Sequence, residues 1–330
     1  MRKSALVMAL VMLTTAAVYS NGQPETLNTA SQYAVALPKN MTVYVGAKAG
    51  GASDIAARVL ATYLQSVTGI NCAIVNQDSA AAYQSVLSAK PDGTAVTVQH
   101  PGIIVSYIAG GIDFDPRESY SVICEYADMG DNALIVPAKA PYSNMDEFVA
   151  YCKSHPGEVS AAIATNSTSQ LIMGLVSRSA DIQLKYVQCA TEADKLANVS
   201  GGYIGLANCS LKNAKQYEEA GMVKVIGTFG SSTGNNPNYP QWKSLPQQGY
   251  DVTLNGRVYF FTPAGIDEGL ANTLNLALKG IVDDKKSVET FGALGGGIVW
   301  SDLATSRKNF NDAVDLYKLI ADDLGMTKIR

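Results

Sequence analysis

The sequence MTVYVGAKAGGASDIAARVLATYLQSVTG at residues 41–69 combines two structural patterns. Its first six residues, 41–46, form a β-branched and aromatic run that predicts a strand. After the glycine pair, apolar residues recur at helical spacing from Ala56 to Val67, and Gly69 is a typical helix end. A strand joined to an amphipathic helix by a short glycine-bearing loop is the beginning of a β-α-β unit.

The same alternation continues along the chain. In the first block, strands are expected at 72–75 and 95–98, with a helix at 80–89 between them. A second block predicts helices at 145–154, 169–178, 191–199 and 212–220, and strands at 159–163, 184–187, 203–207 and 223–228. Two long amphipathic helices follow at 267–282 and 301–324. The pattern predicts an α/β protein with two helix-covered sheets, the first of them parallel.

Two segments are suited to cross between these sheets. Residues 122–136 lie between the two blocks, and residues 258–262 are apolar enough to cross back. The expected domains are therefore 39–125 with 257–330, and 126–256.

Composition and the amino terminus limit the possible classes. The chain has 330 residues, a hydrophobic fraction of 47% and a formal net charge of -4, so nothing favours nucleic acid, which requires a basic face. Residues 1–20 place a short apolar run between a positive start and small residues, which predicts a cleaved signal peptide. Residues 21–38 are polar and predict a linker. An exported protein is expected.

The sequence gives little support for a catalytic or metal-binding site. No GxSxG, HExxH or SxxK arrangement stands out, so no enzyme activity is expected. Five cysteines without CxxC spacing, together with two histidines, argue against a zinc site. The cysteines are expected to be small buried residues, with one or two disulfides left open. No metal and no other cofactor is predicted.

The loop at residues 46–54, between the first strand and its helix, is the first candidate site. Its glycines let backbone amides turn inward, and the first turn of a helix offers unpaired N–H groups that can hold an anion. The candidate ligand-binding residues here are Lys48, Ala49, Gly50, Gly51, Ser53 and Asp54. The alternative is a tight turn in which Ser53 or Asp54 caps the helix, and Lys48 is an ordinary surface lysine.

A second loop carries hydroxyl and amide groups at the start of a helix in the second block. Its candidate residues are Thr165, Asn166, Ser167, Thr168 and Ser169. Such groups could cradle carboxylate oxygens, or the loop could be solvated with one capping residue. If both loops face a shared cleft, they would bind an anion from two sides.

Two further residues lie where a sheet of this type presents ligand contacts. His100 follows the third strand, and a structural histidine is the alternative there. Arg257 lies at the return crossing, where it could pair with a carboxylate or with a surface acid.

Five short motifs resemble one family. They are KAGGASD at 48–54, KPDG at 90–93, DFDP at 113–116, HPG at 155–157 and FTPAG at 261–265. Together they resemble the substrate-binding proteins of tripartite tricarboxylate transporters, the Bug family of periplasmic receptors. The similarity runs from about Met41 to Leu324.

The resemblance implies a two-lobed, type II-like periplasmic binding protein that closes around a small organic anion, mainly a carboxylate. It also implies delivery to membrane permease subunits and a periplasmic location. Carboxylate-binding positions of the family carry onto Ala49, Gly50, Gly51 and Asp54, and onto 165–169. The chain departs from the family at Gln188, where an altered wall indicates an unusual ligand. A receptor for a membrane signalling partner and a binder of a zwitterionic amino acid remain alternatives.

Overall fold

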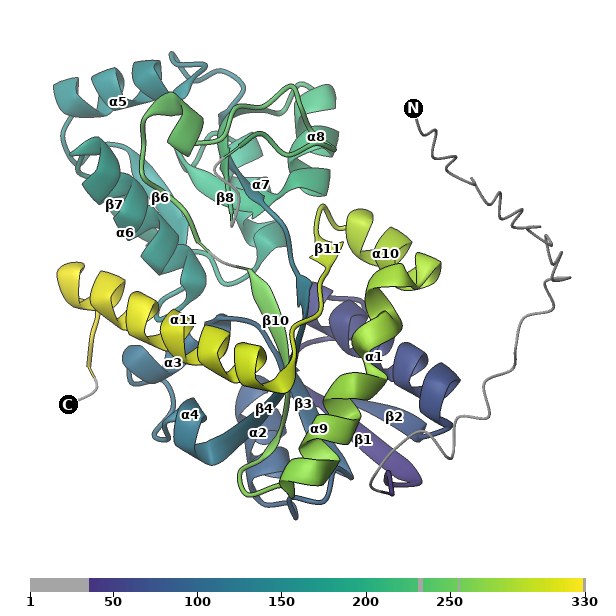
Figure 1. Ribbon diagram of the computed structural model, residues 1–330. Helices are drawn as coiled ribbons and strands as arrows, with labels where there is room; N and C mark the ends of the chain where they lie inside the picture. The colour runs from purple at the N-terminus through teal and green to yellow at the C-terminus, as the bar shows by residue number, and fades with distance from the viewer. Residues whose placement is uncertain (1–35, 231–233, 255, 329–330) are drawn as a thin grey trace, which may run out of the picture.

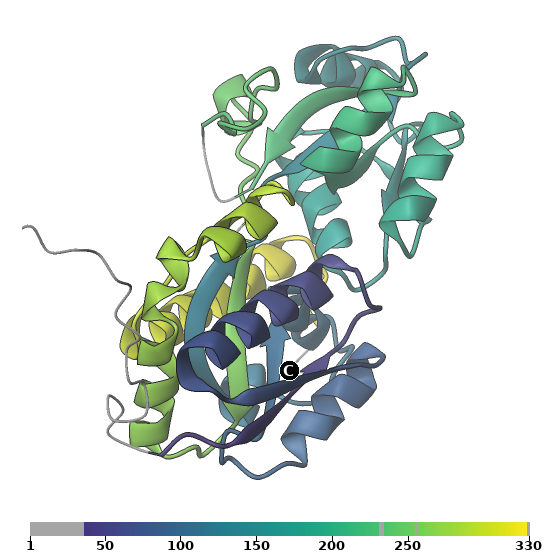
Figure 2. The same ribbon diagram turned by 90° about the vertical axis from the view of Figure 1, so that its right-hand side faces the viewer.

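The computed structural model describes residues 36–230, 234–254 and 256–328. The expected signal peptide, and residues 21–35 of the expected linker, lie outside this range. The described chain forms two lobes, one with the amino- and carboxy-terminal thirds and one with the middle third (Figure 2). The α/β, two-lobed class predicted from the sequence is confirmed.

The first lobe is built on a six-stranded sheet in the order β11-β4-β10-β3-β1-β2. Its strands are β1 (Asn40–Val45), β2 (Asn71–Asn76), β3 (Ala95–Gln99), β4 (Tyr120–Asp128), β10 (Arg257–Pro263) and β11 (Gly297–Ile298). β1 pairs parallel with β2 and β3, whereas β10 lies antiparallel to β3 and to β4. The parallel pairing predicted for the strands within residues 41–98 is confirmed, and the crossing strand β10 adds antiparallel pairs to the same sheet.

Helices cover both faces of this sheet. α1 (Ala52–Thr68), α9 (Glu268–Ala277) and α10 (Lys285–Gly292) lie on one face; α2 (Ser79–Leu87), α3 (Gly102–Ile108) and α11 (Leu303–Asp323) lie on the other (Figure 1). Alternate residues of β10 serve the two cores, because side chains of a strand alternate between faces. Phe260 belongs to the core with Leu60 of α1, and Phe261 belongs to the core with Phe310 of α11.

The second lobe contains a three-stranded sheet and a two-stranded sheet. The first has the order β8-β5-β9, with β5 (Asn132–Pro137) antiparallel to β8 (Ala207–Ser210) and β9 (Val223–Phe229). The second pairs β6 (Ser160–Ile163) with β7 (Lys185–Gln188) in parallel. Its helices are α5 (Met145–Ser154), α6 (Thr168–Ala180), α7 (Glu192–Ser200) and α8 (Leu211–Glu219).

Several elements differ from their predicted bounds. The strand predicted at 203–207 begins at Ala207, because Tyr203 stays 80% exposed after a glycine turn and Leu206 forms only an isolated bridge to Ala161. The helix predicted at 267–282 divides into α9 and the 3-10 helix η3 (Lys279–Asp283). Short elements without a long apolar period were not predicted: α3, α4 (Pro116–Ser119), α10 and the 3-10 helix η2 (Pro246–Gln248).

The chain crosses between the lobes over residues 129–131. β4 ends at Asp128 and β5 begins at Asn132, so the predicted division at residues 125 and 126 falls within β4. Gly130 has a φ of +79°, and a Cβ there would meet the backbone of Gly295 at 2.0 Å. Only glycine fits this crossing, because a side chain would collide with backbone.

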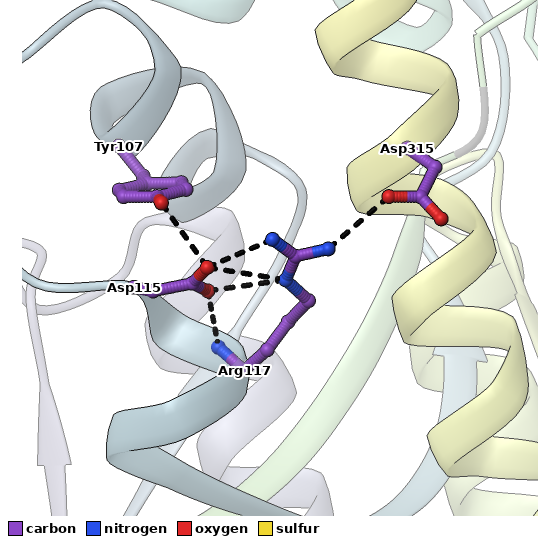
Figure 3. A network of polar contacts seen from close by, with 4 residues as sticks. All are labelled: Tyr107, Asp115, Arg117 and Asp315. Atoms are coloured by element: carbon purple, nitrogen blue, oxygen red, sulfur yellow. Dashed lines mark hydrogen bonds and ion pairs between the residues drawn. The ribbon is translucent and has the colours of Figure 1, made fainter. Parts of the chain in front are cut away.

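The carboxy-terminal helix is fastened to the first lobe by a polar network (Figure 3). Asp115 caps α4, accepts a hydrogen bond of 3.1 Å from the Tyr107 hydroxyl, and pairs with Arg117 at 2.8 Å. Arg117 also reaches Asp315 of α11 at 3.1 Å. Because these residues come from three helices, the network ties the end of the chain to its beginning.

All five cysteines are free thiols, so the disulfides that the sequence left open do not form. Burial raises the pKa of the Cys152 thiol to about 11, which keeps it protonated and unreactive at neutral pH. Within the described residues, no helix combines the length and apolar character required to span a membrane.

Candidate functional site

A cavity of about 490 Å³ lies between the two lobes. This volume is within the range of ordinary small-molecule sites. Residues from the first lobe, the second lobe and the crossing segments share its lining. The polar and titratable side chains among them are Ser53, Ser79, Tyr83, Gln99, His100, Ser106, Asn132, Ser167, Thr168, Ser169, Glu192, Lys195 and Asn208.

The loop before α1 is held in shape by Asp54, which is 1% exposed. The Asp54 carboxylate accepts hydrogen bonds from the Gly50 amide at 2.8 Å, from Arg58 at 2.8 Å and from Asn76 at 3.0 Å. The Arg58 hydrogen bond, supported by the other donors, lowers the pKa of Asp54 to about 2. Asp54 therefore organises the loop, and its negative oxygens are already engaged by the protein.

Ser53 is the residue of this loop that lines the cavity. It lies in the first turn of the seventeen-residue helix α1, whose N-cap Gly51 makes no side-chain capping bond. Lys48, Ala49 and Gly50 are exposed, Gly51 is partly exposed, and none of the four is part of the cavity lining. Of the candidate residues in the first loop, those that line the cavity are therefore confined to the start of α1.

The loop before α6 is ordered by its own hydroxyl groups. Ser167 donates to the Ala164 carbonyl at 2.6 Å, and Ser169 accepts from the Ala164 amide at 2.8 Å. Ser167, Thr168 and Ser169 all line the cavity. Asn166 adopts the left-handed conformation, with φ +56°, which asparagine tolerates better than most residues. These bonds fix the start of α6 against the cavity.

Two other candidates from this region bind each other instead. The Thr165 amide and hydroxyl both donate to Oε1 of Gln188, at 3.0 and 2.7 Å. The Asn166 amide donates to Gln170 at 2.8 Å. Thr165, Asn166 and Gln188 are absent from the cavity lining, because these local bonds direct them along the loop.

His100 lines the cavity on the side of the first lobe. Its Nδ1 accepts a hydrogen bond of 3.0 Å from the Gly102 amide, which places the ring proton of the neutral tautomer on Nε2. Burial lowers the pKa of His100, so the ring is neutral at physiological pH. A neutral histidine of this tautomer can donate one hydrogen bond to a ligand through Nε2.

Arg257 pairs with acids of its own lobe. Its Nε lies 3.2 Å from Glu125 and 3.4 Å from Asp128, both of β4. The neighbouring Gly256 lines the cavity, whereas Arg257 does not. The arginine thus stabilises the paired crossing strands, and the sequence prediction of a ligand contact is not supported by its position.

Two charged residues of α7, Glu192 and Lys195, line the cavity, and the sequence did not predict Lys195 there. Lys195 is 7% exposed and donates to Asn208 at 2.9 Å, and burial lowers its pKa. Glu192 accepts three hydrogen bonds on Oε1, from the Ser210 amide and hydroxyl and from Asn213. The available signal was the position of Lys195 four residues before the apolar Val199, on the buried face of the helix.

Comparison with known proteins gives a consistent picture. A protein of Cupriavidus necator, named UPF0065 protein in gbd 5'region, is 23% identical over 289 residues, covering 86% of this chain and 87% of its own. The structure of the periplasmic binding protein BugD aligns with a TM-score of 0.73 at 20% identity, over 87% of this chain and 98% of that one.

The structure of R. palustris Rpa4515 with adipate aligns with a TM-score of 0.76 at 18% identity, over 88% of this chain and 99% of that one. At such identities the likeness concerns the fold. The family model described as tripartite tricarboxylate transporter family receptor matches residues 56–326, which is most of the chain. This protein therefore belongs to the tripartite tricarboxylate transporter receptor family, TctC.

Proposed function

We propose that this protein captures a small carboxylate in the cleft between its lobes and presents it to a membrane permease of the tripartite tricarboxylate type. One observation carries the proposal: Ser53 at the start of α1 and Ser167–Ser169 at the start of α6 line the same cavity from opposite lobes. Helix starts and hydroxyl groups favour negative oxygens.

The comparisons support this choice of ligand class. The chain belongs to a receptor family named for tricarboxylate transport, and Rpa4515, which shares its fold, is described with adipate. The export signal expected at residues 1–20 and the periplasmic relative BugD support a periplasmic location. Delivery to permease subunits rests on the family assignment.

The lining favours binding over catalysis. Among the lining residues, His100 is the one best suited to act as a catalytic base. Its Nδ1, however, already accepts a hydrogen bond from the backbone amide of Gly102. A nucleophilic serine would need such a nitrogen as its proton acceptor. The proposed function is therefore passive binding with closure of the lobes, without turnover.

The experiment that tests binding uses Thr168→Val. Thr168 lines the cavity, and replacing its hydroxyl with a methyl group removes a possible donor to the ligand while preserving side-chain shape. We expect dicarboxylates such as adipate to stabilise the native protein in thermal unfolding, by about 2.7 kcal/mol at a hundredfold excess over Kd. In Thr168→Val we expect this affinity to fall by about tenfold.

Thr62→Val is the matched control, because Thr62 is exposed on α1 and is no part of the cavity lining. It should bind as the native protein does. If a panel of mono-, di- and tricarboxylates leaves the melting temperature of the native protein unchanged, the proposed function is wrong.

A further inference from the structure

The two charges that line the cavity differ in how well the protein itself satisfies them. Glu192 receives three donors at 2.7 to 3.0 Å from Ser210 and Asn213, so its charge is held within the second lobe. Lys195 has three N–H donors and makes one hydrogen bond among the described residues, to the neutral Asn208. The Lys195 ammonium is therefore the charged group that still has donors available for a ligand.

Burial makes this arrangement costly in the absence of an anion. Lys195 is 7% exposed, and no carboxylate lies within ion-pair distance of its Nζ in the described part of the chain; Glu192 favours the charged form of Lys195 only from beyond that distance. A buried ammonium is normally paired, because desolvation disfavours its charged form. A ligand anion in the cavity would supply the missing partner, and it would do so where little water competes.

Lys195 is also separate from the hydroxyl-bearing helix starts. It lies on α7 and its partner Asn208 on β8, whereas Ser53 lies on α1 and Thr168 on α6. The hydroxyls at the start of α6 bond to one another and to Ala164, with no bond to Lys195. The cavity of about 490 Å³ is large enough for a ligand that reaches both groups.

We propose that Lys195 is a specificity-determining residue that forms an ion pair with a second acidic group of the ligand, with Asn208 positioning its ammonium. The inference rests on the proposed function and deepens it: the helix starts hold one carboxylate, and Lys195 selects ligands that carry two.

The test compares diacids with their half-esters. The probes are succinate, glutarate and adipate, each with its monomethyl ester, because the ester keeps the carbon chain of the diacid and replaces one carboxylate charge with a small neutral group. Calorimetric titration is performed on the native protein, Lys195→Met, Lys195→Arg and the control Lys212→Met, whose lysine is exposed on α8. Thermal unfolding without ligand verifies that each variant is folded.

We expect the native protein to prefer at least one diacid over its half-ester by about tenfold or more. Lys195→Met should bind that diacid more weakly than the native protein does, and no more tightly than it binds the half-ester. Lys195→Arg should retain part of the preference for the diacid. Lys212→Met should match the native protein.

Equal native affinity for every diacid and its half-ester would overturn the inference and leave the proposed function standing. The same holds if Lys195→Met keeps the preference for the diacid, or if zwitterionic amino acids bind more tightly than the diacids. If neither diacids nor half-esters bind the native protein, the inference fails, and the panel of mono-, di- and tricarboxylates then decides the proposed function.

Discussion

At the scale of single residues, Asp54 illustrates how a ligand candidate becomes a structural residue. Its carboxylate is buried and accepts three hydrogen bonds, so its pKa falls from 3.8 to about 2. We expect Asp54→Asn to lower the free energy of unfolding by about 1–3 kcal/mol at pH 7, because buried donors lose their charged acceptor.

The pH dependence of this loss follows from linkage. A carboxylate whose folded pKa is depressed contributes stability above its unfolded pKa and loses it as pH falls towards the folded pKa. The difference between Asp54→Asn and the native protein should therefore shrink between pH 4 and 2, as the cited pKa values require. Urea unfolding measures it, with the exposed Asp322→Asn as control. A pH-independent difference would contradict this account.

The candidate site was predictable from sequence only in part. Ser53, His100 and Ser167–Ser169 line the cavity, because the end of a strand followed by a helix start leads to the cleft in this fold. Local chemistry predicts little about Gln188 and Arg257, whose partners Thr165 and Glu125 lie far away in the sequence. The only sequence signal for Lys195 was its spacing from Val199 on the buried face of a nine-residue helix, and this spacing alone does not show that the helix faces the cavity.

At the scale of elements, strongly periodic segments were predictable and short ones were not. α5 occupies Met145–Ser154 as its apolar spacing predicted, and β9 begins at the expected Val223. α4 has four residues and depends on the Asp115 cap and on its ties to α11. The cap is local, but the tie to α11 joins segments far apart in the chain, so no local pattern contains it.

The backbone conformation of Gly50, in the loop before α1, leads to a further prediction. Its φ of +81° lies in the left-handed region, and a Cβ there meets no atom within 4 Å. A valine would therefore be strained by its backbone and not by a neighbour, and the strained loop should lose its bond to Asp54. We expect Gly50→Val to abolish stabilisation by carboxylates in a melting assay.

Gly221 provides a matched control for this loop. It has a φ of +69° and equally open surroundings, but it lies between α8 and β9, outside the cavity lining. Gly221→Val should lower the melting temperature similarly while keeping the response to ligand. A normal ligand response in Gly50→Val would remove this loop from the binding function.

At the scale of the whole molecule, α11 connects the lobes beside the cleft. It packs on β4 of the first lobe, and its end reaches α6 of the second, where Asp323 pairs with Arg178 (Figure 1). Leu171 of α6, Val105 of α3 and Tyr317 of α11 line one small cavity at this junction. The side chains at this junction belong to one apolar core that runs through both lobes.

This continuity predicts that the junction sets how far the cleft opens. Leu171 is 1% exposed in the core shared by both lobes, and Leu171→Ala removes part of the apolar surface that this junction buries. We expect a larger radius of gyration in X-ray scattering and a carboxylate affinity about tenfold weaker, since more of the binding energy must close the lobes. Leu64→Ala, in the separate core of the first lobe, should lose comparable stability without either change. If both variants weaken binding equally, loss of stability and not lobe separation is the cause, and the junction has no control over closure.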